Sequence, residues 1–318
     1  MAREQLAAAV KPENVAGPTT AKCALRIVNV ADLLKMDLPE RGYVLYPVIP
    51  EQGLAMLYAP RGLGKTWAAL SIAYAVASGQ VAFGEWTAPE PRRVLYLDGE
   101  MPARTMKERL AFIVAGYEGE PPSAEYLRIL TPDLQPDYMP NIATPEGQEA
   151  LAPSLADVDF VVVDNLATLG RHGRENESEG WLPVQEWLLR LRRSGKSVLL
   201  VHHAGKGGNQ RGTSAREDIL DTVIAMRKPN DYQAEEGARF EMHLEKARGI
   251  FGTAARPLEA TLHLDNSTAF WTTRQIEDVE LERVAGLKAE GLSVRDIADE
   301  TGISKSRVQR LIKRMAAA

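Results

Sequence analysis

Apolar residues in this chain are gathered in short blocks that alternate with longer segments of mixed polarity. Four of the blocks have the length and continuity of strands that are buried on both faces, and they occupy residues 54–58, 94–97, 158–163 and 197–201. The segments between them include stretches of helical character, with the clearest at residues 67–78, 104–117 and 181–191. Strands that alternate with helices favour a mostly parallel, twisted sheet flanked by helices. The predicted fold class is therefore α/β.

The pattern changes toward the C-terminus. Residues 239–246 alternate in polarity like a strand near the edge of a sheet, and residues 262–272 predict a hairpin. From residue 276 the apolar spacing becomes helical, and Ser293 and Ser304 are expected to cap the second and third of three short helices. Such a trio with a small apolar core predicts a helix-turn-helix module. The expected organisation is a flexible arm, a large α/β domain and a small all-α domain, at residues 1–23, 24–274 and 275–318.

The sequence APRGLGKT at residues 59–66 connects the first apolar strand to an alanine-rich helix. A glycine-bearing loop in this position that ends in Gly-Lys-Thr is the pattern of a phosphate-binding P-loop, although alanine replaces the first glycine. Backbone N–H groups would bind phosphate oxygens, Lys65 would contact the β- and γ-phosphates, and Thr66 would hold Mg²⁺. With ATP and Mg²⁺ as the cofactors, the predicted nucleotide-binding residues are Ala59, Pro60, Arg61, Gly62, Leu63, Gly64, Lys65, Thr66 and Trp67.

Two further strands end in carboxylates. Glu100 follows the strand at residues 94–97, and ligands of parallel sheets bind at the carboxyl ends of strands. A carboxylate there can deprotonate a water for attack on the γ-phosphate, with Asp98 as the neighbouring alternative and a solvated turn as the competing interpretation. Asp164 ends the strand at residues 158–163 in the manner of a Walker B element, whose carboxylate holds Mg²⁺.

His202 and His203 follow the strand at residues 197–201. A polar side chain at this strand end can touch the γ-phosphate and report its loss to the following loop, but a structural hydrogen-bonding role is also open for either histidine. The glycine-rich loop after them carries Lys206 and Arg211, which suit a segment that becomes ordered on nucleic acid. A flexible linker is the alternative interpretation of this loop.

Lys246 and Arg248 are two residues apart at the end of the alternating strand, so their side chains are expected on the same side. Two cations on one face near a subunit edge could reach the γ-phosphate of a neighbouring subunit and act in trans as an arginine finger does. A solvated pair on an edge strand is the competing interpretation.

Composition narrows the choice of cofactor and compartment. The chain has 318 residues, 45% of them hydrophobic and 25% charged, as in ordinary globular proteins. A single cysteine, Cys23, excludes an internal disulfide and a cysteine-built zinc site. The net charge of −5 provides no overall attraction for nucleic acid, so DNA binding would depend on local basic patches. No membrane span or signal-peptide core is visible, and a cytoplasmic location is expected.

One such basic patch is the last predicted helix. Residues 304–315 contain five basic residues and no acidic residue. A recognition helix places its N-terminal residues at base edges and its cations on phosphates. The predicted contacts to double-stranded DNA are Lys305, Arg307 and Arg310, and a helical packing or oligomerisation appendage is the alternative.

The motifs LYAPRGLGKT, YLDGEM, VVVDN, LLVHHAGKG, RGTS and EKARG resemble, in this order, the motif series of RecA/DnaB-like ATPases. Residues 43–271 resemble in particular the RepA-type hexameric replicative helicases of plasmids and their AAA-family relatives on mobile elements. The resemblance implies a RecA-like core in a six-membered ring, with ATP between subunits and single-stranded DNA in the central channel. Carried over by position, it implies that Lys65 and Thr66 bind phosphate and Mg²⁺, that Glu100 activates water and that Asp164 holds Mg²⁺.

The same resemblance implies that His203 senses the γ-phosphate and that Lys246 and Arg248 act in trans. The C-terminal helix-turn-helix is not part of this core and resembles the small DNA-binding domains of resolvases and regulators. The leading prediction is therefore an ATP-hydrolysing motor, a ring-forming replicative helicase of a plasmid or other mobile element. The alternatives are an ATPase that loads or remodels partners without translocating, and a DNA-binding regulator whose oligomeric state is set by ATP.

Overall fold

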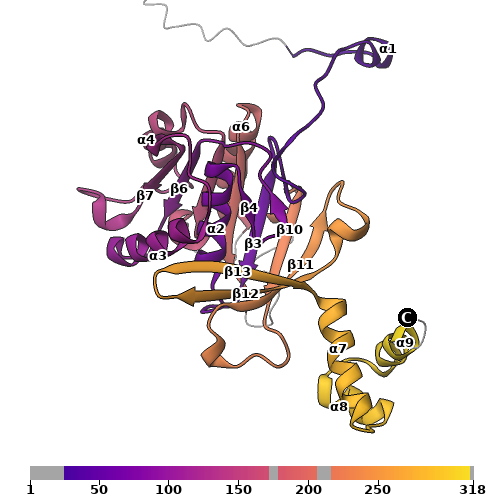
Figure 1. Cartoon of the computed structure of the whole chain (residues 1–318). Helices are drawn as coiled ribbons and strands as arrows, with labels where there is room; N and C mark the ends of the chain where they lie inside the picture. The colour runs from indigo at the N-terminus through magenta and orange to yellow at the C-terminus, as the bar shows by residue number, and fades with distance from the viewer. Residues whose placement is uncertain (1–24, 172–177, 206–215, 316–318) are drawn as a thin grey trace, which may run out of the picture. The chain divides into compact units, whose positions relative to one another are not determined.

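The computed structural model describes residues 25–171, 178–205 and 216–315. The chain divides into two compact units, residues 1–40 and residues 41–318. The described part of the first unit contains one short helix, α1 (Val30–Leu34), which has no buried side chain. The predicted arm at residues 1–23 lies outside the described residues. The second unit contains the sheet, the P-loop and the C-terminal helices (Figure 1).

The second unit is organised around a nine-stranded sheet in the order β13-β12-β11-β10-β3-β9-β8-β6-β7. All pairs from β10 to β7 are parallel, whereas β11, β12 and β13 extend the sheet in antiparallel fashion. This arrangement confirms the predicted mostly parallel α/β class. The strands are β3 (Leu54–Ala59), β6 (Val94–Asp98), β7 (Leu127–Leu130), β8 (Phe160–Asp164), β9 (Ser197–His203), β10 (Thr222–Arg227), β11 (Arg239–Ala247), β12 (Leu258–Asp265) and β13 (Thr268–Gln275).

Two small antiparallel pairs lie outside this sheet. One joins β1 (Tyr43–Leu45) to β2 (Ile49–Pro50) just before the P-loop strand. The other joins β4 (Val81–Ala82) to β5 (Trp86–Thr87) just after the P-loop helix. A bridge between Tyr46 and Thr87 links the two pairs, so they are anchored to each other beside the main sheet.

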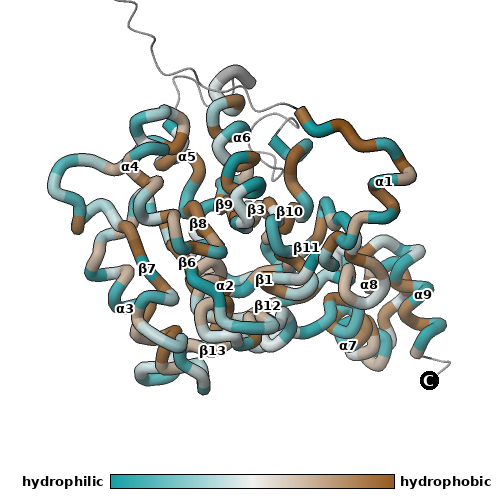
Figure 2. The backbone as a smooth tube through the Cα atoms, turned by 90° about the horizontal axis from the view of Figure 1, so that it is seen from above, coloured by the Kyte–Doolittle hydropathy of each residue, from teal (hydrophilic) through white to brown (hydrophobic). Residues whose placement is uncertain are grey.

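Helices cover both faces of the sheet, as the tube in Figure 2 shows. One core contains side chains of α2 (Lys65–Ser78) and α3 (Ala103–Gly116). The other contains side chains of α4 (Pro145–Leu155), α5 (Leu166–Leu169) and α6 (Ser178–Arg193). Successive side chains of a strand point to opposite faces, so alternate residues of β3 enter alternate cores. Burial on both faces explains why these strands are continuous apolar blocks in the sequence.

The predicted hairpin is formed by β12 and β13, which are paired from Leu258 and Gln275 to Asp265 and Thr268. It packs across α2 and α3. The indole nitrogen of Trp271 donates to the Ser71 hydroxyl at 2.8 Å, and a side chain at Gly116 would collide with the backbone of β13. Strand β11 lies near the edge of the sheet, as predicted: it pairs with β12 alone at residues 239–240, with both neighbours at residues 241–242, and with β10 alone at residues 243–247.

The C-terminal module consists of α7 (Ile276–Ala289), α8 (Val294–Thr301) and α9 (Lys305–Met315). Ser293 caps α8 through a capping box, and Gly302 ends that helix in the left-handed conformation at φ 72°. The buried core of the module confirms a helix-turn-helix, and it consists of Val284, Ile297, Ala298, Val308 and Leu311. The contribution of Val284 shows that α7 is part of this core.

Candidate nucleotide-binding site

The P-loop leaves β3 at Ala59 and enters α2 at Lys65. Gly62 and Gly64 have left-handed φ values of 78° and 93°, which suit glycine. Ala59 is the last residue of the strand and has an ordinary negative φ, so its conformation is compatible with alanine. Gly64 also needs to be small, because a Cβ there would lie 2.7 Å from the Cβ of Ala238.

The Lys65 side chain folds back over this loop. It is 7% exposed, and Nζ donates to the carbonyls of Ala59 at 3.2 Å and Pro60 at 2.9 Å. Burial lowers the pKa of Lys65, and the negative charges of Asp164 and Glu100 oppose that shift. The loop therefore holds one partly desolvated cation, which suits a phosphate group, close to two carboxylates, which suit a divalent cation.

Asp164 is buried at the carboxyl end of β8, with 3% of its surface exposed. Its Oδ2 atom accepts a hydrogen bond from the Tyr96 hydroxyl at 2.6 Å. Burial raises the pKa of Asp164 to about 6, against hydrogen bonds from Tyr96 and Thr66 that lower it, while Asp98 and Glu100 raise it further. A carboxylate held among other acids gains from a nearby cation, so Asp164 and Thr66 together suit Mg²⁺.

Asp98 and Glu100 have different environments although they are two residues apart. Asp98 is buried, accepts a hydrogen bond from the Thr131 hydroxyl at 2.8 Å, and accepts another from the Met101 amide at 3.1 Å. Burial raises the pKa of Asp98. Glu100 is exposed and faces the cavity beside the P-loop. Asp98 thus shapes the turn, and Glu100 is the carboxylate with access to a bound water.

A cavity of about 940 Å³ brings the predicted residues together at the carboxyl ends of the parallel strands. Among its lining residues are Lys65, Thr66, Glu100, Asp164 and His203. Within the described ranges no group of three or more His, Cys, Asp or Glu side chains could hold a metal alone. Phosphate oxygens and water would therefore complete the shell of a Mg²⁺ ion bound here.

The two histidines at the end of β9 point in different directions. His203 lines the cavity, whereas His202 is fully buried and its Nε2 atom lies 3.0 Å from the Arg216 guanidinium. The alternation of side chains along a strand separates the two residues in this way. Of the pair, only His203 can meet a phosphate in the cavity.

The cavity also contains residues that the sequence motifs did not indicate. The guanidinium of Arg109 lies 5.2 Å from the centre of the Trp67 ring, and both residues line the cavity. Leu262 and Leu264 of β12 line it as well. Arg109 belongs to α3 and has no motif of its own, so only its helical position after Glu100 could have indicated it.

Lys246 and Arg248 lie beside the amino-terminal ends of β10 and β3, away from the P-loop. Lys246 is opposite Val223 of β10, which in turn pairs with Met56, and the Arg248 amide bonds to the Asp221 carbonyl before β10 begins. Both side chains bond to the Asp218 carbonyl, at 3.4 Å for Lys246 and 3.2 Å for Arg248, so they do share one side. Neither is among the described residues that line the cavity, because the P-loop leaves β3 at the opposite strand end.

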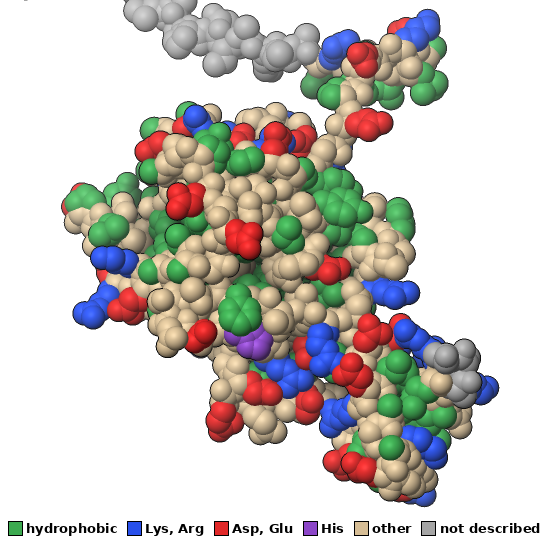
Figure 3. Space-filling view, in the orientation of Figure 1, with side chains coloured by type: hydrophobic (Ala, Val, Ile, Leu, Met, Phe, Trp, Pro, Cys, Tyr) green, Lys and Arg blue, Asp and Glu red, His purple; other side chains and the backbone are tan. Residues whose placement is uncertain are grey.

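The structure describes some, but not all, of the residues predicted to contact DNA. Lys206 and Arg211 lie outside the described residues. On α9, Lys305 and Arg310 are exposed, whereas Arg307 forms an ion pair with Glu280 of α7 at 2.5 Å. Figure 3 shows basic side chains at the surface of the α7–α9 module, with acidic ones between them.

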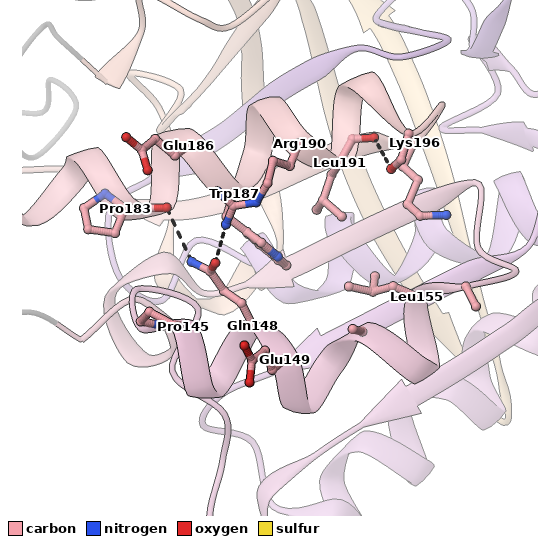
Figure 4. Close-up of a pocket in the computed structure, with 13 residues that line it drawn as sticks. Pro145, Gln148, Glu149, Leu155, Pro183, Glu186, Trp187, Arg190, Leu191 and Lys196 are labelled. Carbon is pink, nitrogen blue, oxygen red and sulfur yellow. Dashed lines mark hydrogen bonds between the residues drawn. The ribbon is translucent and has the colours of Figure 1, made fainter. Parts of the chain in front are cut away.

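A second cavity of about 800 Å³ lies between α4 and α6 (Figure 4). Trp187 and Leu191 form part of its wall, and Gln148 bonds to the Pro183 carbonyl at 3.4 Å across it. None of the predicted site residues lines it. The residues predicted to bind phosphate therefore line the P-loop cavity and not this one, although the two cavities are similar in size.

Comparison with known proteins agrees with this geometry. The sequence profile of a family described as "AAA domain" matches residues 19–209, well over half of the chain. The chain belongs to this AAA domain family. A second profile, described as "MarR family", matches residues 281–318, which include most of the helix-turn-helix module behind the AAA domain.

Other comparisons add little to the AAA domain assignment. No curated protein matches the sequence significantly. A solved KaiC-like protein from the hyperthermophilic archaeon Pyrococcus horikoshii OT3 is 15% identical with a TM-score of 0.46, over 70% of this chain and 90% of that one. No helix in the described ranges is long and apolar enough to cross a bilayer.

The raised pKa of Asp164 in the AAA domain predicts a stability change in the nucleotide-free protein. An acid with a raised folded-state pKa contributes its stability below the unfolded value, near 4, and loses it as the pH rises through about 6. We expect Asp164→Asn to raise the free energy of unfolding at pH 7.5 by about 1–3 kcal/mol and to have little effect near pH 4.5. Denaturant unfolding at both pH values measures this, and an unchanged or lower stability at pH 7.5 would contradict it.

Proposed function

We propose that this protein is a Mg²⁺-dependent ATPase whose catalytic centre is the P-loop cavity. The observation that carries the proposal is the convergence of Lys65, Thr66, Asp164 and Glu100 on one cavity, from three separate places in the sequence. A cation for phosphate, a hydroxyl and a carboxylate for Mg²⁺ and an accessible carboxylate for water are the parts that phosphoryl transfer to water requires.

The proposed roles follow from the environment of each side chain. Lys65 binds the β- and γ-phosphates above the loop. Thr66 and Asp164, which are hydrogen-bonded to each other, would hold Mg²⁺ when the nucleotide is bound. Glu100 accepts a proton from the attacking water, and its exposure leaves room for that water. His203 contacts the γ-phosphate and reports hydrolysis to the residues that follow β9.

The Trp67 and Arg109 pair is a proposed contact for the nucleoside. Its planar groups line the same cavity as the phosphate-binding residues. Flat cationic and aromatic side chains stack well on nucleobases. Residues 59–67 would then provide the phosphate cradle and, through Trp67, part of the base site.

We further propose that the ATPase works as a ring, the hexamer that the resemblance implies.

 The supporting observation is the position of Lys246 and Arg248, which lie away from their own cavity and near one another at the C-terminal end of β11, where that strand pairs with β10 alone. Cations so placed would complete the site of a neighbouring subunit rather than their own. ATP would then lie between subunits.

The DNA-directed part of the proposal rests on the C-terminal module. Lys305 and Arg310 are exposed on α9, in a module whose helix-turn-helix core is complete. Such residues would contact double-stranded DNA. Combined with the ring, this supports a motor that moves on single-stranded DNA as a replicative helicase of a plasmid or other mobile element.

A second candidate function is ATP-dependent binding of duplex DNA without translocation. It is favoured by the segment between β10 and β11, which touches both functional regions. Glu235 and Gly237 line the nucleotide cavity, while Asn230 donates to the Thr301 carbonyl of α8 at 3.3 Å and Asp231 pairs with Arg283 of α7 at 3.6 Å. A nucleotide that shifts this segment would alter the helix-turn-helix directly.

The ATPase proposal predicts distinct effects for two glutamates. Glu100→Gln should lower ATP turnover by about 100-fold or more because the general base is lost, while nucleotide affinity stays within about threefold. Glu108→Gln, on the exposed surface of α3, is the matched control and should leave turnover unchanged. Steady-state hydrolysis and calorimetric binding measure both. Normal hydrolysis by Glu100→Gln would refute the assignment of the base.

The ring proposal predicts complementation between inactive subunits. Arg248→Ala and Glu100→Gln proteins should each be inactive, but a mixture should recover activity at interfaces that combine the intact Glu100 of one subunit with the intact Arg248 of the next. For random assembly of equal amounts, roughly a quarter of the sites should be functional. Hydrolysis rates of the mixture measure this, and a mixture no more active than its components would count against a role in trans.

The motor and the duplex-binding ATPase differ in what they do to DNA. A motor should displace a strand from forked DNA only with ATP, and Lys65→Ala should abolish displacement because the phosphate contact is lost. Robust hydrolysis without displacement would exclude the motor. A footprint on duplex DNA that changes with nucleotide and is lost in a Lys305→Ala, Arg310→Ala double variant would then favour the second candidate.

A further inference from the structure

Asn165 lines the P-loop cavity directly after Asp164, and none of the roles proposed above uses it. The side chain is 1% exposed. Its Oδ1 atom accepts hydrogen bonds from the backbone N–H groups of Ala167 at 3.0 Å and Thr168 at 3.2 Å, which caps α5. Because backbone N–H groups can only donate, the atom that faces them must be the amide oxygen. The amide NH₂ group therefore has a fixed direction, away from the first turn of α5.

The Nδ2 atom of Asn165 is buried and has no hydrogen-bond partner among the described residues. A buried amide donor without a partner is unfavourable, and most such groups in folded proteins are satisfied. This donor belongs to a residue of the cavity wall. An oxygen atom of a ligand bound in the cavity could therefore accept its hydrogen bond.

The order of the strands indicates which part of a bound nucleotide would accept the hydrogen bond from Asn165. Strand β8 lies between β6, which leads to Glu100, and β9, which ends at His203, so Asn165 follows the strand between them. The turn that carries Glu100 packs closely here, because the Gly99 amide donates to the Asp164 carbonyl at 2.7 Å. The terminal phosphate of a nucleotide must lie between Lys65 and the water that Glu100 activates, which is the space that this wall borders.

We infer that the Asn165 amide donates a hydrogen bond to an oxygen of the terminal phosphate of a bound nucleoside triphosphate. This inference rests on the proposed function and deepens it, because the contact makes the site distinguish a triphosphate from a diphosphate. A diphosphate has no oxygen in this position and loses nothing when the donor is removed. Hydrogen bonds to charged groups typically change an affinity by about 10- to 100-fold.

The test uses Asn165→Ser in the full chain. Serine keeps an oxygen that can cap α5 but lacks the amide donor. Dissociation constants for the Mg²⁺ complexes of ADP and of the non-hydrolysable analogue AMP-PNP are measured by calorimetry. We expect AMP-PNP binding to weaken by about 10-fold or more, and ADP binding to change by less than about threefold.

Two further variants separate this role from a structural one. Asn165→Asp keeps the size of the side chain and the capping oxygen but places a carboxylate where the donor was, so it should weaken AMP-PNP binding selectively and at least as much. Thr168→Val removes a hydroxyl that bonds to the Asn165 carbonyl at 3.0 Å, and it should leave the ratio of the two dissociation constants unchanged. Melting temperatures show whether each variant is folded.

The outcomes are distinguishable. If Asn165→Ser and Asn165→Asp weaken ADP and AMP-PNP by the same factor, or change neither, Asn165 is only a helix cap and the inference is wrong. If the wild-type protein binds neither nucleotide, the proposed function itself fails. If the wild-type protein hydrolyses ATP while both variants keep the wild-type ratio, the ATPase proposal stands without this contact.

Discussion

The burial of Asp164 at the end of a parallel strand is the constraint on which the site depends. A carboxylate that is almost wholly removed from water needs hydrogen bonds or a cation, and the protein provides hydrogen bonds from Tyr96 and Thr66. These bonds tie the strand that carries Asp164 to the neighbouring strand and to the first turn of the P-loop helix. The same burial raises the pKa of Asp164 to about 6. The charged carboxylate is therefore unfavourable until a cation binds beside it.

The parallel sheet places the other residues of the site next to Asp164. Strands β3, β9, β8 and β6 are neighbours that run in the same direction, so their carboxyl ends bring together segments as far apart in sequence as Ala59 and His203. The antiparallel strands β11, β12 and β13 contribute differently. Their hairpin adds Leu262 and Leu264 to the cavity wall and leads, through the end of β13, directly into α7. The nucleotide cavity and the helix-turn-helix are thus joined by both chain continuity and the contacts of Asn230 and Asp231.

Much of this arrangement could be predicted from the sequence because it follows from short-range patterns. Continuous apolar blocks indicated the buried strands, and Gly-Lys-Thr after such a block indicated the P-loop. The helix-turn-helix was predictable from its spacing and from the cap at Ser293.

Other features depend on three-dimensional packing that no local pattern encodes. Alternation along β9 separates His202 from His203, but the sequence does not say which face holds the phosphate cavity. Arg109 reaches the cavity from the middle of a helix, and the Asn165 donor stands out only because its oxygen is occupied by the α5 cap. The pairing of Arg307 with Glu280 likewise arises from the packing of α7 on α9.

The central claim is that the P-loop cavity binds a Mg²⁺–nucleoside triphosphate, and a crystal structure with Mg²⁺ and AMP-PNP tests it most directly. The account predicts the phosphates in the loop at residues 59–66, with Mg²⁺ held near Thr66 and Asp164 and the terminal phosphate facing Glu100. Nucleotide bound elsewhere, or a P-loop cavity without nucleotide at saturating AMP-PNP, would contradict it.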